Sequence, residues 1–201
     1  WAEVGVDAGE YARQLMAFSK AEGKGMTELR DPLEMLARAH RQVHVQGSTT
    51  ACILTLEGRT LQAVNLGDSG FLVVRNGNIL FRSSPQQHDF NFPFQLGSDG
   101  DDKLEDAHRY SIPVQRGDVI VMGTDGLFDN VHDRDVAGLV RRSQERGDPP
   151  VDTATHIARL ANIRGTDPNI MSPFAQAAAE YGYQYRGGKA DDITVVVSYV
   201  E

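Results

Sequence analysis

The chain has 201 residues, of which 40% are hydrophobic and 24% are charged, and this composition is typical of a folded globular protein. Its formal net charge of −8 argues against nucleic acid or an anionic membrane as the main partner, because both are bound by clustered Lys and Arg. No stretch approaches the ~20 apolar residues of a membrane span. The single cysteine, Cys52, excludes an intramolecular disulfide.

The N-terminal part of the chain is predicted to form two helices followed by two β-hairpins. Residues 7–20 show helical periodicity behind an N-cap at Asp7, and Asp31-Pro32 opens a second helix. Short turns, at residues 57–59 and at Asn76-Gly77-Asn78, join the strand-like runs in pairs. These runs are residues 49–56, 60–66, 71–75 and 79–82. Consecutive hairpins predict antiparallel pairing.

The middle segment, residues 83–107, shows no sustained periodicity and contains prolines and glycines. Such a long segment inside a domain is usually functional or mobile. We expect it at the surface near the Asp125 end of the sheet, where it would influence substrate choice. The alternative is that its aromatic residues, Phe90, Phe92 and Phe94, plug an edge of the core.

The C-terminal half alternates between strand and helix signals. Strands are predicted at residues 109–113, 118–122 and 193–200, and helices at 133–142, at 151–162 and from Ser172-Pro173 onward. The segment Arg186-Gly187-Gly188-Lys189 is interpreted as a flexible basic approach to Asp191. The predicted fold class is α+β, with antiparallel sheets faced by helices, and residues 1–201 are expected to form a single domain.

Three acidic turns touch the ends of predicted strands. Gly67-Asp68-Ser69 and Thr124-Asp125-Gly126 follow strand-like runs, and Ala190-Asp191-Asp192 precedes one. Carboxylates that gather at rigid strand ends repel one another unless a hard cation lies among them, so the pattern indicates a Mg²⁺ or Mn²⁺ site with oxygen ligands. For any single turn, Asp beside Gly or Ser is explained equally well as turn chemistry.

Four ordered motifs carry a resemblance that covers nearly the whole chain. They are Gly47-Ser48-Thr49-Thr50, Gly67-Asp68-Ser69, Gly123-Thr124-Asp125-Gly126-Leu127-Phe128-Asp129 and Asp191-Asp192-Ile193-Thr194. Their order resembles the metal-dependent type 2C (PPM-type) serine/threonine protein phosphatases. This resemblance implies a β-sandwich flanked by helices on both sides (α-β-β-α). Residues 84–96 are similar to the mitochondrial and plastid branch of that family.

The resemblance also implies a reaction and its residues. A phosphoprotein substrate would lose phosphate from serine or threonine by attack of a metal-activated water, without a phosphoenzyme and without a catalytic side chain. Asp125 and Asp191 would bind the main pair of Mg²⁺ or Mn²⁺ ions, and Asp68 and Asp129 a weaker third ion or its water shell. Asp192, which stands where many members of the family carry Asn, would support these ligands. Thr124 and Ser69 would also support them by hydrogen bonds, although a purely structural role explains each of these two equally well.

The family's first metal motif, Asp-Gly-x-Gly-Gly, is not among these residues. Because the chain also begins without Met, we interpret it as an N-terminally truncated piece with weak or no activity of its own. The alternative function is a catalytically silent phosphatase-like module that binds a partner. A thiol phosphatase mechanism is not supported, since Cys52 lies in a strand-like run. A Ser-His-Asp hydrolase and an ATP-hydrolysing P-loop protein are not supported either, since no Gly-x-Ser-x-Gly or P-loop motif is present.

Overall fold

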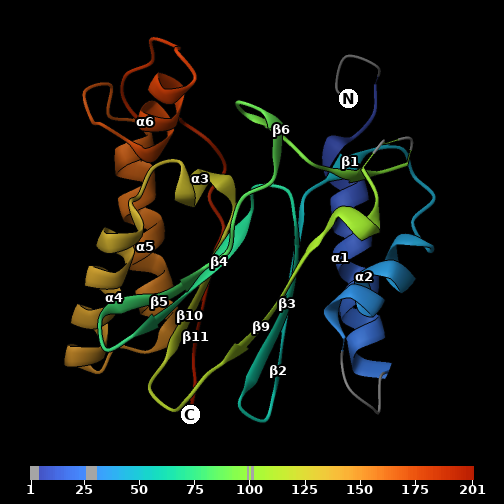
Figure 1. Ribbon diagram of the computed structural model, residues 1–201, viewed down its shortest axis with the longest axis horizontal. Coiled ribbons are helices and arrows are strands. Elements are labelled where there is room, and N and C mark those ends of the chain that lie inside the picture. The colour runs from blue at the N-terminus through green and yellow to red at the C-terminus, as the bar shows by residue number, and fades with distance from the viewer. Residues whose placement is uncertain (1–4, 26–30, 99, 101) are drawn as a thin grey trace. The chain divides into compact units, whose positions relative to one another are not determined.

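The computed structural model describes residues 5–25, 31–98, 100 and 102–201, and its backbone divides into two compact units (Figure 1). Unit 1 comprises the described residues of Trp1–Gly67, Pro85–His88 and Pro93–Val114. Unit 2 comprises Asp68–Ser84, Asp89–Phe92 and Gln115–Glu201. No helix among the described residues is both long and apolar enough to cross a bilayer.

Unit 1 is a three-stranded antiparallel sheet with two helices. The strand order is β2 (Ala51–Glu57), β3 (Thr60–Leu66) and β9 (His108–Pro113). Two shorter strands, β1 (Ser48–Thr49) and β8 (Leu96–Gly97), pair separately, and η2 (Leu104–Asp106) is a 3-10 turn. Helices α1 (Ala8–Gly25) and α2 (Pro32–His40) bury apolar residues against the sheet. The predicted caps are confirmed, since Asp7 accepts from the Gly9 amide and Asp31 accepts from the Leu33 amide, both at 2.9 Å.

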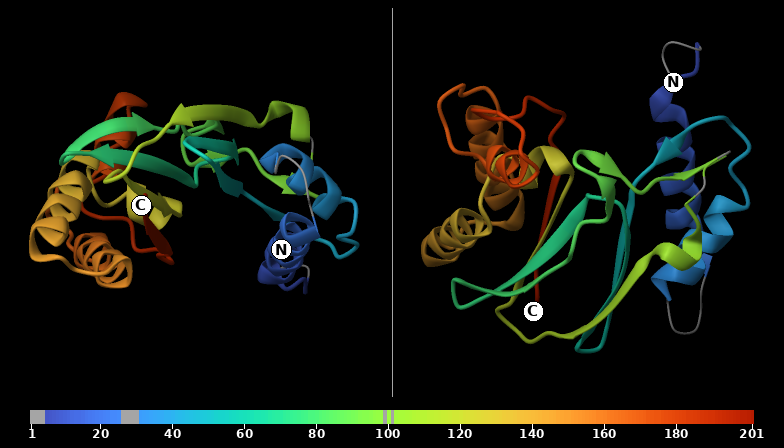
Figure 2. Two further views of the ribbon diagram at one scale, coloured as in Figure 1. Left: turned by 90° about the horizontal axis from the view of Figure 1, so that it is seen from below. Right: turned by 45° about the horizontal axis from the view of Figure 1, so that its top comes forward.

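Unit 2 is a four-stranded antiparallel sheet covered by helices. The strand order is β11 (Val195–Tyr199), β10 (Val119–Gly123), β4 (Gly70–Arg75) and β5 (Asn78–Arg82). Helices α4 (Asp133–Arg146) and α5 (Pro150–Gly165) lie side by side and pack on this sheet (Figure 2). The short α3 (Asp125–Phe128) follows β10, and α6 (Pro173–Glu180) completes the unit. Alternate strand residues such as Leu72, Val74, Val119 and Val121 form the core beneath the helices.

Two boundaries differ from the sequence prediction for physical reasons. Helix α4 continues past residue 142 to Arg146, where Gly147 adopts φ +72° and ends it with a left-handed residue that accommodates glycine best. Strand β11 begins at Val195, two residues later than predicted, because the backbone of Thr194 bonds instead to Thr124. The predicted caps of α6 are confirmed: Ser172 Oγ accepts from the Ala175 amide at 3.0 Å.

The middle segment has more structure than the sequence prediction assigned to it. Within its described part, which leaves out residues 99 and 101, β6 (Gln87–Asp89) and β7 (Phe92–Pro93) form a short hairpin. Phe90 and Phe94 of this segment contact different aromatic residues. Phe90 packs against Phe174, Tyr181 and Tyr183 in unit 2, whereas Phe94 stacks on His88 in unit 1.

A buried ion pair at the start of β10 provides a stability prediction. The Arg75 guanidinium donates two hydrogen bonds of 2.7 Å to the Asp118 carboxylate, whose side chain is 1% exposed and also accepts from the Gln115 amide. Asp118→Ala leaves these donors without an acceptor, so we expect it to lower the free energy of unfolding by about 2 kcal/mol. Urea unfolding measures this, with the exposed Glu180→Ala as a control that should change little.

The same pair predicts a pH dependence. Hydrogen bonding from Arg75 lowers the pKa of Asp118 below its usual range in the folded protein. A carboxyl group with a lowered folded pKa contributes stability above its unfolded pKa of about 3.9, and this contribution is lost as pH falls through the folded pKa. Stability should therefore fall less steeply below about pH 4 in Asp118→Asn than in the unmodified protein. The same decrease of stability below about pH 4 in both proteins would show that Asp118 does not contribute to this pH dependence.

Candidate metal centre

Strand register brings the three acidic turns to one end of the unit 2 sheet. Gly123, the last residue of β10, pairs with Gly70 at the start of β4 and with Val195 at the start of β11. The residues just beyond these three positions therefore lie at the same end of the sheet, where these strands begin or end. They are Asp68 and Ser69 before β4, Thr124 and Asp125 after β10, and Asp191 and Asp192 before β11.

Helix α3 places two carboxylates at this end of the sheet. Asp125 is its first residue, and the Asp125 side chain accepts from the Gly126 amide at 2.9 Å. Asp129 caps its C-terminus, with its amide bonded to the Asp125 carbonyl at 2.7 Å. The tight approach of the third turn requires glycine at position 126, since a Cβ there would lie 2.4 Å from the Asp192 carbonyl oxygen.

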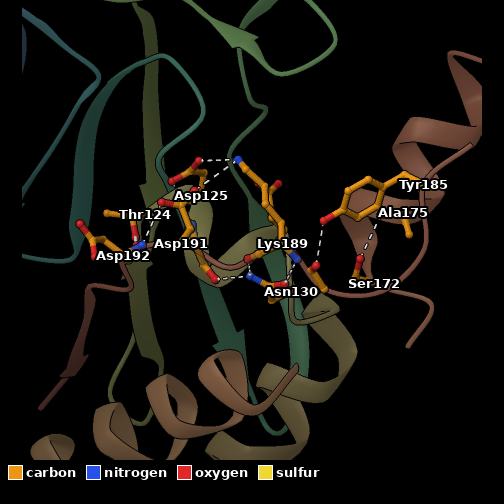
Figure 3. Close-up of polar contacts among 12 residues, drawn as sticks. Thr124, Asp125, Asn130, Ser172, Ala175, Tyr185, Lys189, Asp191 and Asp192 are labelled. Carbon is orange, nitrogen blue, oxygen red and sulfur yellow. Dashed lines mark hydrogen bonds and ion pairs between the residues drawn. The ribbon is translucent and has the colours of Figure 1, made fainter. Parts of the chain in front are cut away.

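A single ammonium group lies among these carboxylates. Lys189 Nζ is 3.0 Å from Asp125 Oδ2, 2.8 Å from Asp129 Oδ2 and 3.4 Å from Asp191 Oδ2. Figure 3 shows Lys189 beside Asp125 and Asp191. The structure thus brings together three of the four predicted ligands around one cation. The fourth, Asp68, is close enough for its charge to help raise the pKa of Asp129.

The electrostatics of the cluster follow from its partial burial. The pKa of Asp129 is raised to about 6, chiefly by desolvation and to a smaller extent by the charges of Asp125 and Asp68, against the opposing effect of the Lys189 hydrogen bond and charge. Burial also disfavours the charged form of Lys189, but the hydrogen bonds that it donates to Asp129 and Asp125, together with their negative charges, outweigh this effect and raise the pKa of the ammonium. Lys189 is therefore protonated at neutral pH.

Thr124 fastens the third acidic turn to the end of β10. Its hydroxyl donates to the Asp192 carbonyl at 3.2 Å and accepts from the Thr194 amide at 3.1 Å, as Figure 3 shows in part. The Asp192 amide donates to Asp191 Oδ1 at 2.8 Å, which orients that carboxylate. The side chain of Asp192 is exposed, and Ser69 is half-buried directly before β4.

Asn130 was not predicted to take part in the site. Asn130 is fully buried and joins two distant segments: its Nδ2 donates to the Gly126 carbonyl at 2.9 Å and to the Lys189 carbonyl at 2.8 Å, while its Oδ1 accepts from the Lys189 amide at 2.9 Å. The sequence indicated only that a polar Asn directly follows Asp129. Its contact with Lys189 spans 59 residues and therefore could not be predicted from a local sequence pattern.

The loop before Asp191 is packed, which corrects the interpretation of Arg186-Gly187-Gly188-Lys189 as a flexible approach. Gly188 lies so close to helix α5 that a Cβ there would be 1.9 Å from the Arg164 carbonyl oxygen. Its own carbonyl accepts from the Tyr185 hydroxyl at 2.8 Å, and the Gly187 carbonyl accepts from Ser172 Oγ at 2.6 Å. Lys189 was present in the predicted motif, but its role as the central cation was not anticipated.

The donor chemistry of the cluster fits a hard dication. Its ligands are all carboxylate oxygens, and they already surround a positive charge. In the part of the chain that the structure describes, however, no three His, Cys, Asp or Glu side chains are arranged to hold a metal directly. The three carboxylates point at Lys189 Nζ, so a metal at their centre would require this ammonium to move.

Comparisons with known proteins place the chain in a family. The family model described as "Stage II sporulation protein E (SpoIIE)" matches residues 5–201. A relative from Arabidopsis thaliana, "Probable protein phosphatase 2C 80", is 50% identical over the whole chain, which spans 49% of that protein. The chain thus spans about half the length of this curated relative.

Two solved structures show the same fold. The photosystem II phosphatase PBCP superposes with a TM-score of 0.91 at 32% identity, over 100% of this chain and 83% of that one. The catalytic domain of the serine/threonine protein phosphatase PstP, in complex with two manganese ions, superposes with a TM-score of 0.64 at 19% identity, over 94% and 80% of the two chains. The expected α+β fold of type 2C phosphatases is confirmed by these likenesses.

Proposed function

The chain belongs to the SpoIIE/protein phosphatase 2C family, and we propose that it carries out the metal-dependent hydrolysis of phosphoserine and phosphothreonine in proteins. The observation that carries this proposal is the meeting of three acidic turns at one sheet edge, with three carboxylates around a single cation. The comparisons do not favour the silent binding module, because the relatives are named as phosphatases.

Two Mg²⁺ or Mn²⁺ ions are proposed to bind at this edge. Asp125 and Asp191 would be ligands of this pair, while Asp68 and Asp129 would bind a weaker third ion. The two manganese ions in the PstP structure and the all-oxygen donor set support this assignment. Once bound, the ions would neutralise phosphoryl oxygens and lower the pKa of a water near the phosphorus atom.

The protein's own residues would position this chemistry. Asp191 is oriented by the Asp192 amide, and Thr124 ties the Asp192 turn to the end of β10. Helix α3 fixes Asp125 relative to Asp129 through one backbone hydrogen bond. Metal ions that enter a preorganised set of carboxylates would be bound without the entropy cost of ordering those ligands, and would then position the phosphate.

We propose that residues 1–201 act as one phosphatase domain, whose partner is a phosphoprotein. An organellar location, in a plastid or mitochondrion, is also proposed. The support is the 32% identity to a photosystem II phosphatase. Import of the radiolabelled full-length protein into isolated chloroplasts and mitochondria tests this location, and resistance to added protease marks uptake. Failure of both organelles to take it up would contradict it.

Metal removal tests the proposed function. The full-length protein should release phosphate from a phosphothreonine peptide with Mn²⁺ or Mg²⁺ present, lose this activity in EDTA and regain it when excess metal is restored. Phosphate release is measured colorimetrically at fixed pH. Activity that survives complete chelation would contradict the proposal.

A cysteine variant separates this mechanism from thiol chemistry. Cys52 lies half-buried within β2 of unit 1 and belongs to none of the acidic turns. Cys52→Ser should therefore retain at least ~50% of the phosphatase activity, apart from any loss of folded protein, because no thiol takes part in metal-assisted hydrolysis. Loss of activity in a variant with an unchanged melting curve would show that the thiol takes part.

A further inference from the structure

We propose that Lys189 is an internal counter-cation that holds the acidic turns together without metal and must leave them when a divalent ion binds. This inference rests on the proposed function. Its first support is geometric, since one ammonium nitrogen lies within 3.4 Å of carboxylate oxygens from Asp125, Asp129 and Asp191. The Lys189 side chain is only 18% exposed, so solvent does not compete strongly for it.

The carboxylates need such a cation. Three like charges that point at one position repel one another, and this repulsion grows as the site becomes drier. An ammonium group compensates one unit of that charge through hydrogen bonds to Asp125 and Asp129 of 3.0 and 2.8 Å. A dication compensates two units from the same position, so ammonium and metal compete for the same oxygens.

The main chain of Lys189 is held in place by neighbouring residues. Asn130 bonds to both the amide and the carbonyl of Lys189, and Gly188 is packed against the Arg164 carbonyl. The displacement therefore involves only the flexible four-carbon stem of the lysine. The Phe174 ring, whose centroid is 5.1 Å from Nζ, offers the ammonium a neighbouring cation–π surface.

Metal titration tests the competition. Isothermal titration of the full-length protein with Mn²⁺ at fixed pH should show about tenfold tighter binding in Lys189→Met than in the unmodified protein, because the competing charge is gone. The metal-free melting temperature of Lys189→Met should also fall, since its carboxylates are then uncompensated. Arg186→Met is the matched control: it removes a positive charge from the same loop at an exposed position. It should leave both quantities nearly unchanged.

Amine labelling tests the displacement in the unmodified protein, so it does not depend on whether the variant folds. An acylating ester followed by mass spectrometry should modify Lys189 poorly in EDTA and clearly faster with Mn²⁺. Exposed Lys20 on α1 should react equally in both conditions.

The outcomes separate the two proposals. The counter-cation role would be overturned if folded Lys189→Met bound Mn²⁺ with unchanged affinity, or if Mn²⁺ did not increase the labelling of Lys189. The phosphatase proposal would still stand in either case, provided that Mn²⁺ binds and supports activity. If the unmodified protein binds no Mn²⁺ and is inactive with it, both proposals fail. Tighter binding in the variant together with metal-dependent labelling supports the inference.

Discussion

Asp125→Asn is expected to reduce phosphate release by the full-length protein at least ~100-fold, because changes in residues that only support metal ligands already cost about 10–100-fold. The amide that replaces the carboxylate carries no negative charge and is a poorer ligand for a hard dication. It retains an oxygen that can accept from the Gly126 amide, so the start of α3 should remain intact. The loss should therefore be one of metal binding and rate, measured by steady-state hydrolysis of a phosphothreonine peptide.

A control variant distinguishes this effect from a general change of charge. Asp152→Asn removes one carboxylate from the exposed first turn of α5 and should leave hydrolysis within about twofold of the unmodified protein. The Mn²⁺ affinity should fall only in Asp125→Asn. If Asp125→Asn retained full activity in Mn²⁺ at concentrations near those that half-saturate the unmodified protein, Asp125 would not be a ligand.

Asn130→Ala is expected to lower the free energy of unfolding by about 3 kcal/mol, since a buried side chain with three hydrogen bonds is removed and its partners lose them. The lost bonds connect α3 to the main chain of Lys189, so the acidic turns should also lose their relative placement. Urea unfolding gives the stability change, and Mn²⁺ titration gives the change in the site.

Asn130→Asp tests whether the amide hydrogens are required. It conserves size, but it presents a carboxylate to the carbonyl oxygens of Gly126 and Lys189, which both need a donor. We expect it to destabilise the protein at least as much as the alanine variant does. Wild-type stability in both variants would show that the contacts of Asn130 do not hold these segments together.

The elements that sequence alone predicted are those with a local cause. Asp31-Pro32 and Ser172-Pro173 each supply a capping side chain and a proline at the first helical position, and both begin helices in the structure. The strands were visible because β-branched and other large apolar residues occupy most buried positions of β4 and β10. Asn76-Gly77 forms the predicted turn, and both residues have positive φ.

The arrangement of the candidate site was predictable only in part. Asp125 and Asp191 were expected to lie close together because each adjoins a strand end, and the register of β10 with β11 brings those ends together. The central position of Lys189 was not predictable, because it depends on contacts across 60 and 64 residues to Asp129 and Asp125. Gly188 was interpreted as flexible since glycine usually permits motion, whereas here its lack of a side chain permits close packing.

The proposed function requires that the acidic turns at the end of β10 bind the ions that support hydrolysis. Anomalous diffraction from crystals of the full-length protein soaked in Mn²⁺ locates manganese independently of the protein atoms. We expect anomalous peaks within about 2–2.6 Å of carboxylate oxygens of Asp125 and Asp191, at distances typical of hard-cation ligation. Crystals of active, Mn²⁺-saturated protein without a peak at either carboxylate would contradict it.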